Sequence, residues 1–199
     1  AEEHAEALFE ANQLDTEGTN WAYLPYCPFS DLKSYHSWVR ENQGLEDPVF
    51  LAIVEKESGR PLGIASYLRI HPAEGSIEVG HIHFSPLLQR TTSATESMFL
   101  MMQWAFEAGY RRYEWKCNAL NQASRRAAQR LGFSFEGIFR QMMIVKGRNR
   151  DTAWFAAIDS EWPALKTAFE CYLDEKNFDE EGKPVTSLSS LTAPLLHKK

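Results

Sequence analysis

The segment with the clearest chemical potential is Phe84–Glu96 (FSPLLQRTTSATE), where a predicted strand passes through a short loop into a predicted helix. The first turn of a helix leaves backbone N–H groups without helical partners, and the positive end of the helix dipole lies there. Hydroxyl groups and one cation surround this turn, from Arg90, Thr91, Thr92, Ser93 and Thr95. Such turns bind phosphate groups, so we expect a pyrophosphate-binding site. The alternative is an ordinary polar helix start, because Thr and Ser are common there for capping alone.

Three further titratable side chains lie on the strand predicted just before this turn, residues 77–84. His81 and His83 are two residues apart and share one face of a regular strand, whereas Glu78 points to the other face. A histidine pair on one face could ligate a metal ion, but no third ligand stands at a recognisable spacing. We therefore expect no metal site. Cys117 stands alone within another predicted strand, where a small buried side chain is more common than a nucleophile.

Several motifs in this sequence resemble those of the GNAT superfamily of N-acetyltransferases. Residues 89–94 (QRTTSA) resemble the Q/R-x-x-G-x-G/A loop that holds the coenzyme A pyrophosphate, although Thr92 replaces the usual glycine. Residues 121–124 (NQAS), with 131–133 (LGF) after them, resemble the signature of the RimL-like branch, the ribosomal-protein N-acetyltransferases. The motifs follow the family's order and spacing, and the resemblance spans roughly residues 30–172.

The resemblance implies an N-acetyltransferase that depends on acetyl-CoA and uses no metal. The acetyl group would pass from acetyl-CoA to a primary amine by direct attack in a ternary complex. The acceptor would be a protein N-terminus or a small-molecule amine. A non-catalytic GNAT-like module that binds an acyl-CoA or a protein partner is the alternative, because Thr92 occupies the glycine position. Glycine there allows the backbone to approach phosphate closely, or to adopt a positive φ angle.

The same resemblance implies which residues bind the coenzyme. Backbone groups of the strand would contact the pantetheine arm near Ile82, His83 and Phe84. The loop and the first helical turn would hold the pyrophosphate through Gln89, Arg90, Thr91, Thr92, Ser93, Ala94 and Thr95. Asn121 would bind the arm or orient the acceptor amine, and the Ser124 hydroxyl would protonate the departing thiolate. The alternatives are simple helix capping by Asn121 and a surface hydroxyl at Ser124.

Attack by an amine requires its neutral form, so a general base is useful at pH 7. Glu78 is the first candidate, because it lies eleven residues before Gln89, where histone-modifying members of the superfamily have their base glutamate. A structural carboxylate paired with a neighbouring arginine is the alternative reading of Glu78. His81 and His83 are rival bases.

The acceptor site in this family is built from the first two helices, the loop between them and a late hairpin. Here the loop over residues 20–26 (NWAYLPY) carries Trp21, Tyr23 and Tyr26. The resemblance implies that these three residues contact the acceptor together with His81 and Asn121. Alternatively, the aromatic side chains only cover the core beneath the loop.

Hydrophobic periodicity predicts the elements that hold these residues in place. Helical spacing predicts helices over residues 3–14, 30–41, 91–108, 121–131 and 162–172. Apolar runs between turn residues predict strands over 49–54, 62–70, 77–84, 113–117, 133–145 and 152–158. This order predicts an α+β fold, a mixed αβ layer architecture. The resemblance adds a largely antiparallel central sheet of about six or seven strands flanked by helices, with a splayed parallel strand pair at the coenzyme site.

A length of 199 residues fits one domain. We expect a single GNAT acetyltransferase domain over residues 1–176 and a weakly structured C-terminal tail over 177–199. The strand that family members usually have before their first helix is not evident in this sequence.

Composition restricts the classes of partner. The formal net charge of −6 argues against direct nucleic-acid binding. The three cysteines are widely spaced, which fits a reducing compartment better than a disulfide framework. No charged-then-apolar leader begins the chain and no run of about 18 apolar residues occurs in it. We therefore expect a cytoplasmic protein, monomeric or homodimeric, with no membrane partner.

Overall fold

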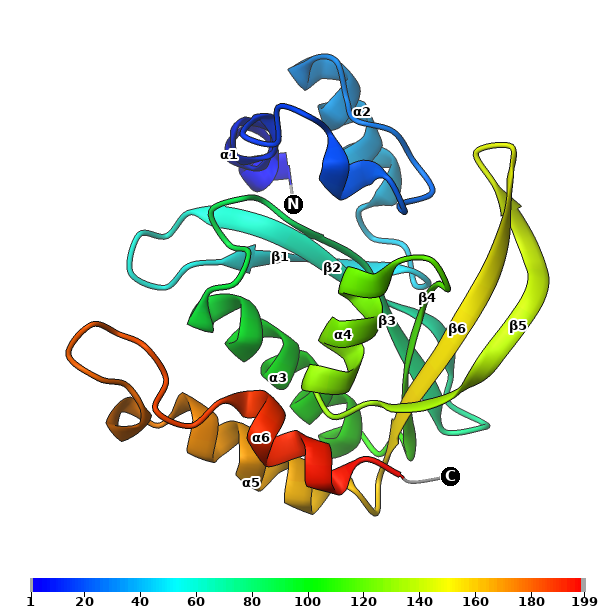
Figure 1. Ribbon diagram of the computed structural model, residues 1–199. Coiled ribbons are helices and arrows are strands. Elements are labelled where there is room, and N and C mark those ends of the chain that lie inside the picture. Colours follow the sequence, from blue (N-terminus) through cyan, green and yellow to red (C-terminus); the bar gives the residue numbers. More distant parts are fainter. Residues whose placement is uncertain (1, 198–199) are drawn as a thin grey trace. The chain divides into compact units, whose positions relative to one another are not determined.

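The computed structural model describes residues 2–197, whose helices and strands are drawn in Figure 1. The helices are α1 (Glu2–Gln13), α2 (Leu32–Asn42), α3 (Thr92–Glu107), α4 (Gln122–Arg130), α5 (Trp162–Leu173) and α6 (Leu188–Thr192). Three short 3-10 turns are η1 (Thr19–Trp21), η2 (Glu175–Asn177) and η3 (Ala193–Leu195). The strands are β1 (Val49–Val54), β2 (Pro61–His71), β3 (Ser76–Phe84), β4 (Arg112–Asn118), β5 (Ser134–Val145) and β6 (Arg148–Ile158).

The predicted α+β fold is confirmed. Each of the five predicted helices and six predicted strands corresponds to an element of the structure, and the six strands follow the order β1-β2-β3-β4-β6-β5 in the sheet. By their contacts the elements form two compact units, one of residues 2–70 with 78–97 and the other of residues 71–77 with 98–197. The domain boundary at residue 176 stays a prediction.

In the first unit, α1 and α2 pack against the β1–β2 hairpin. Asp31 caps α2, since its side chain accepts a hydrogen bond of 2.8 Å from the backbone N–H of Ser34. The apolar stripes of the two helices meet in one buried cluster, consisting of Ala5, Leu8, Tyr35, Val39 and Ile64. Each of Leu8, Val39 and Ile64 contributes roughly 1.5–3 kcal/mol of transfer free energy when it leaves water. The cluster therefore fixes both helices, and the loop between them, above β2.

In the second unit, β6 lies between β4 and β5 and pairs antiparallel with both. Buried aromatic residues from these strands pack on one another, with Tyr113, Trp115 and Phe133 at ring-centroid distances of 5.5 and 5.6 Å. Gly132 ends α4 with a φ of +87°, and a Cβ atom there would lie 2.3 Å from Leu165 of α5. Only glycine meets both conditions, which explains the L-G-F motif physically.

The C-terminal segment is more ordered than the sequence suggested. Instead of a weakly structured tail, residues 178–197 contain α6, and Leu188 of this helix is fully buried. The Thr192 hydroxyl donates to the carbonyl oxygen of Arg130 at the end of α4, and the His197 N–H donates to the Ser134 hydroxyl. The expectation of weak structure was wrong because these contacts are long-range and leave no periodic signal. Within residues 2–197, no helix has the length and apolar character needed to span a membrane.

Candidate active site

The turn between β3 and α3 is held by backbone hydrogen bonds and a buried leucine. The Ser85 N–H donates to the carbonyl oxygen of Leu62 on β2 at 3.0 Å, which fixes the end of β3. Leu88 lies beneath the turn, fully buried with Leu62 and Ala94. Thr91 caps α3, because its hydroxyl accepts from the Ala94 N–H at 3.0 Å and donates to the Leu88 carbonyl at 2.7 Å. The turn for which pyrophosphate binding is predicted is therefore an ordered helix N-terminus, and the binding itself stays a prediction.

Thr92 occupies an ordinary position at the start of α3, and the left-handed residue of the turn is Arg90, with a φ of +63°. Position 92 therefore does not need the positive φ angle that a glycine would allow. The N–H groups of Thr92 and Ser93 fall in the first helical turn, which has no helical acceptor for them. Arg90 and Thr92 are exposed, so their polar groups are accessible to an anion at this helix end.

The Gln89 side chain is held away from the helix N-terminus. Its amide donates to the Phe84 carbonyl at 2.9 Å and to the Asn20 side chain at 2.8 Å. Asn20 also lies 3.4 Å from the same carbonyl. The Phe84 carbonyl thus has protein donors already, and Gln89 ties the turn to η1.

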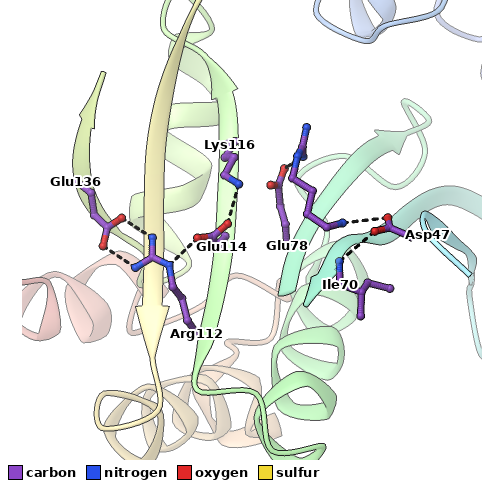
Figure 2. A network of polar contacts seen from close by, with 8 residues as sticks. Asp47, Ile70, Glu78, Arg112, Glu114, Lys116 and Glu136 are labelled. Atoms are coloured by element: carbon purple, nitrogen blue, oxygen red, sulfur yellow. Dashed lines mark hydrogen bonds and ion pairs between the residues drawn. The ribbon is translucent and has the colours of Figure 1, made fainter. Parts of the chain in front are cut away.

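Glu78 is buried on β3 and paired with an arginine (Figure 2). The guanidinium of Arg69 donates to its carboxylate at 2.7 Å, so the predicted alternative, a pair with a neighbouring arginine, is present. A cation at this distance favours the charged form of the carboxylate. Arg69 itself has a φ of +48°, and Asp47 accepts the N–H groups of Arg69 and Ile70 at 3.0 and 3.1 Å.

The two histidines of β3 lie against the aromatic loop. The His83 ring is 4.0 Å from Trp21, and the His81 ring stacks on Tyr26 at 5.8 Å with an interplanar angle of 4°. Burial lowers the pKa of His83 to about 4, although the charge of Asp15 acts in the opposite direction. Burial, helped by the charge of Arg69, also lowers the pKa of His81. Both imidazoles are therefore neutral at pH 7.

His81 interrupts the alternation of β3 because its φ is +49°. The structure thus brings together four of the predicted residues of this unit: Trp21, Tyr26, His81 and His83. Tyr23 does not join them: its side chain is exposed and makes no ring contact within the described chain. Ile82 lies half-buried between the histidines.

In the second unit, Asn121 and Ser124 lie together at the start of α4. The Asn121 side chain accepts the Ser124 N–H at 3.0 Å, so the capping role is present. The Ser124 hydroxyl accepts from the indole N–H of Trp115 at 3.0 Å. Cys117 is buried beside it, and burial raises the pKa of its thiol despite an opposing hydrogen bond from Ser124. A protonated buried thiol is a poor nucleophile.

An ion-pair network crosses β4, β5 and β6 (Figure 2). Arg112 binds Glu114 and Glu136, and Lys116 binds Glu114 while its ammonium lies 3.9 Å above the ring of Trp154. Burial would raise the pKa of Glu114, but hydrogen bonds from Lys116 and Arg112 outweigh it and lower that pKa. Among residues 2–197, no group of three His, Cys, Asp or Glu side chains could hold a metal ion.

Comparison with known proteins gives the family. The family model of the acetyltransferase (GNAT) domain matches residues 1–134. The chain belongs to the GNAT acetyltransferase family. As a GNAT N-acetyltransferase it is an enzyme, and the family reaction is acetyl transfer from acetyl-CoA to an amine. A search of functionally curated proteins gave no match.

Solved structures agree with this assignment. A GCN5-related N-acetyltransferase from Brucella melitensis is 45% identical with a TM-score of 0.93, over 96% of this chain and 87% of that chain. A protein of Chromobacterium violaceum described as a probable GNAT acetyltransferase is 45% identical with a TM-score of 0.76, over 81% and 80%. RimL, a ribosomal L7/L12 alpha-N-protein acetyltransferase solved with coenzyme A, shares the fold at 23% identity and a TM-score of 0.68, over 80% and 92%. The predicted likeness to RimL is thus confirmed as one of fold.

Sequence reasoning missed several residues of this GNAT enzyme that orient the predicted ones. Asn20 holds Gln89, Trp115 donates to Ser124, and Asp47 fixes the backbone of Arg69. All three bonds join residues far apart in the chain or on different elements, so no local sequence spacing predicts them. The sequence did suggest that an arginine pairs with Glu78, but it did not identify Arg69 as that arginine.

Proposed function

We propose that this acetyltransferase modifies a primary amine, either a protein N-terminus or a small-molecule amine, by direct attack in a ternary complex. The observation that carries the proposal is the ordered N-terminus of α3, capped by Thr91 and anchored through Leu88. In the proposal the pyrophosphate of acetyl-CoA is bound there by Arg90, Thr92 and Ser93. The remaining turn residues, Gln89, Thr91, Ala94 and Thr95, hold its shape. Backbone groups near Ile82, His83 and Phe84 bind the pantetheine arm.

Glu78 is the proposed general base, acting directly or through a water molecule. Burial on β3 supports this role, because it keeps the carboxylate in a dry, fixed position. The ion pair with Arg69 acts against it, because a neighbouring cation stabilises the charged carboxylate and lowers its basicity. A base of this kind typically accelerates such a step by about 10²–10⁴-fold. His81 is the competing base, since its neutral imidazole can accept a proton.

Ser124 is the proposed donor to the departing thiolate, and Asn121 is proposed to bind the arm or orient the amine. The Ser124 hydroxyl accepts the Trp115 N–H, so this bond does not use its own proton, for which the sulfur of Cys117 is the competing acceptor. Trp21, Tyr23, Tyr26 and His81 are the proposed acceptor contacts. The proposal also includes a cytoplasmic location and a monomeric or homodimeric state.

The first experiment is calorimetric titration of the purified protein with acetyl-CoA and, in parallel, with coenzyme A. One-site binding that Arg90→Gln weakens would support the coenzyme turn. Absence of binding at millimolar ligand would contradict the assignment of acetyl-CoA to this turn.

Turnover is then followed by thiol release with a panel of amines and N-terminal peptides. Glu78→Gln is expected to lower kcat by about 10²-fold or more while the acetyl-CoA affinity stays unchanged. Glu57→Gln, the same change at an exposed turn position, is the matched control. Equal activity of the two variants would exclude Glu78 as the base and leave His81→Gln as the next test.

A further inference from the structure

The hairpin of β5 and β6, yellow in Figure 1, contains a bulge. The register between the two strands shifts there, so that residues 140–142 of β5 lie opposite a single residue of β6, Asp151. All three bulge residues are exposed. Gln141, in the middle of the bulge, has a φ of +50°, which residues other than glycine adopt at an energetic cost. Because burial contributes little to this bulge, its conformation depends on polar contacts.

The side chain of Asp151 holds the bulge. Its Oδ1 atom accepts the backbone N–H of Gln141 at 2.8 Å and the side-chain amide of Asn149 at 2.9 Å. These two bonds hold the pKa of the Asp151 carboxyl below its usual value, so the group is charged at neutral pH. A hydrogen bond to a charged acceptor is about twice as strong as one between neutral groups. The carboxylate therefore stabilises the positive φ of Gln141.

The main chain of Asp151 is bonded to a different segment, the loop between β4 and α4. Its carbonyl oxygen accepts the N–H of Ala119 at 2.8 Å, one residue beyond the last pair of the β4–β6 ladder. The carbonyl oxygen of Ala119 accepts from the guanidinium of Arg125, in α4, at 3.2 Å. The loop is thus held by β6 through one bond and by α4 through another.

This loop leads directly into the first turn of α4. The Asn121 N–H donates to the Asn118 carbonyl at 2.8 Å, and the Leu120 N–H donates to the Asn118 side chain at 2.9 Å. Asn121 then caps the helix on the N–H of Ser124. Hydrogen bonds therefore connect the bulge, Asp151, the loop and the helix start that carries Asn121 and Ser124, and all of these residues belong to the second unit.

We propose that Asp151 is a positioning residue for acetyl transfer, which fixes the bulge with its side chain and the start of α4 with its main chain. The inference rests on the proposed role of Ser124. Asp151 takes no part in the reaction itself. When its side chain is removed, the bulge and the adjoining backbone of β6 relax, and the displacement reaches Ser124 through Ala119. Displacement of a reacting group by about 1 Å can lower a rate by about 10²-fold.

The first test follows backbone amides by NMR in the full chain without a ligand. Asp151→Ala should shift the amide signals of Gln141 and Ala119 and speed their hydrogen exchange by about tenfold or more, because the bulge loses its acceptor. Asp151→Asn should restore the wild-type signals, because an asparagine Oδ1 accepts the same two N–H groups. Unchanged Ala119 signals in Asp151→Ala would overturn the proposal.

Asp179→Ala is the matched control. The Asp179 side chain also accepts two N–H groups, those of Glu181 at 3.0 Å and Lys183 at 2.8 Å, but in an exposed turn of the C-terminal segment. The control should alter the signals of its own turn and leave those of Gln141 and Ala119 unchanged. Equal effects of Asp151→Ala and Asp179→Ala on the Ala119 amide would contradict the connection through Asp151.

The second test measures turnover by thiol release, with the amine or peptide of the panel that the wild-type enzyme acetylates fastest. Asp151→Ala should lower kcat by about tenfold or more while the KM for acetyl-CoA changes by less than about twofold. Asp151→Asn should recover most of the rate, and Asp179→Ala should keep the wild-type kcat. In a Ser124→Ala background, Asp151→Ala should have little further effect, because both changes act through one group. Additive losses would overturn the proposal.

The two tests separate this inference from the proposed function. If Ala119 responds to Asp151→Ala but Ser124→Ala keeps the wild-type kcat, the connection is supported and the proposed role of Ser124 is refuted. If Ser124→Ala lowers kcat and Asp151→Ala does not, the role of Ser124 is supported and Asp151 is not a positioning residue.

Discussion

The ion pair between Arg69 and Glu78 allows a quantitative prediction. Replacing Arg69 with Met keeps a long apolar side chain but removes the 2.7 Å bond to a carboxylate that is only 4% exposed. A hydrogen bond to a charged group contributes about 1.5–3 kcal/mol, and breaking a fully buried pair costs about 3–5 kcal/mol. Because the Arg69 side chain is 44% exposed, water partly replaces it, and we expect a loss of about 2 kcal/mol.

The assay is urea unfolding followed by tryptophan fluorescence, with the midpoint compared at constant slope. In a protein of this size, a loss of about 2 kcal/mol corresponds to a decrease in Tm of about 4–8 °C. Arg60→Met, at an exposed turn position, is the control. A double-mutant cycle with Glu78→Gln isolates the pair. A coupling energy within about 0.5 kcal/mol of zero would refute the reasoning, because independent sites give that value.

Three further predictions concern the β3 histidine, the glycine position and Ser124. The pKa of His83 falls from 6.5 to about 4 on folding. The free energy of unfolding should therefore be independent of His83 above pH 6.5 and decrease by about 3 kcal/mol as the pH falls to about 4. His83→Phe should remove this dependence from urea unfolding curves. Thr92→Gly should change the coenzyme A Kd by less than about threefold in calorimetry, because Thr92 needs no positive φ. Ser124→Ala should lower stability by about 1–3 kcal/mol in thermal unfolding, because the buried Trp115 N–H loses its acceptor.

Each of these three predictions has a control variant or an outcome that would contradict it. Exposed His71→Gln should leave the pH dependence intact, and retention of the full dependence in His83→Phe would contradict the assignment to His83. A tenfold or greater gain in affinity from Thr92→Gly would mean that Thr92 blocks close approach of phosphate. For Ser124, the exposed hydroxyl change Ser58→Ala should leave stability nearly unchanged, and an equal effect of the two would contradict the role of the Trp115 bond.

The local sequence pattern was sufficient to predict the helices and strands and the N-caps of two helices. Ser30 or Asp31 was a candidate cap for α2 and Asn121 one for α4. Asp31 and Asn121 each accept the N–H three residues later. Such caps are predictable because donor and acceptor are adjacent in sequence. The helix start after β3 was predictable for the same reason, and pyrophosphate binding there stays a prediction. The left-handed residue of this turn is Arg90 and not Thr92, which stands at the position of the family's glycine.

The orientation of the β3 side chains was not predictable from alternation. A strand of period two would place His81 on the face opposite Glu78, but the positive φ of His81 breaks that period. Arg69 on β2 has a similar φ, stabilised by the carboxylate of Asp47 from before β1. These conformations depend on contacts between segments that are distant in sequence, and a periodicity argument cannot include them.

The packing of α6 has a practical consequence for any shortened version of this enzyme. Residues 178–197 look dispensable by composition, yet they bury Leu188 and hold the C-terminal end of α4 through Thr192 and Arg130. The other end of that helix presents Asn121 and Ser124. Deletion after residue 176 would therefore loosen the helix that carries both residues, and the resulting fragment should be cut faster by proteases around α4 even though no residue of the proposed site is missing.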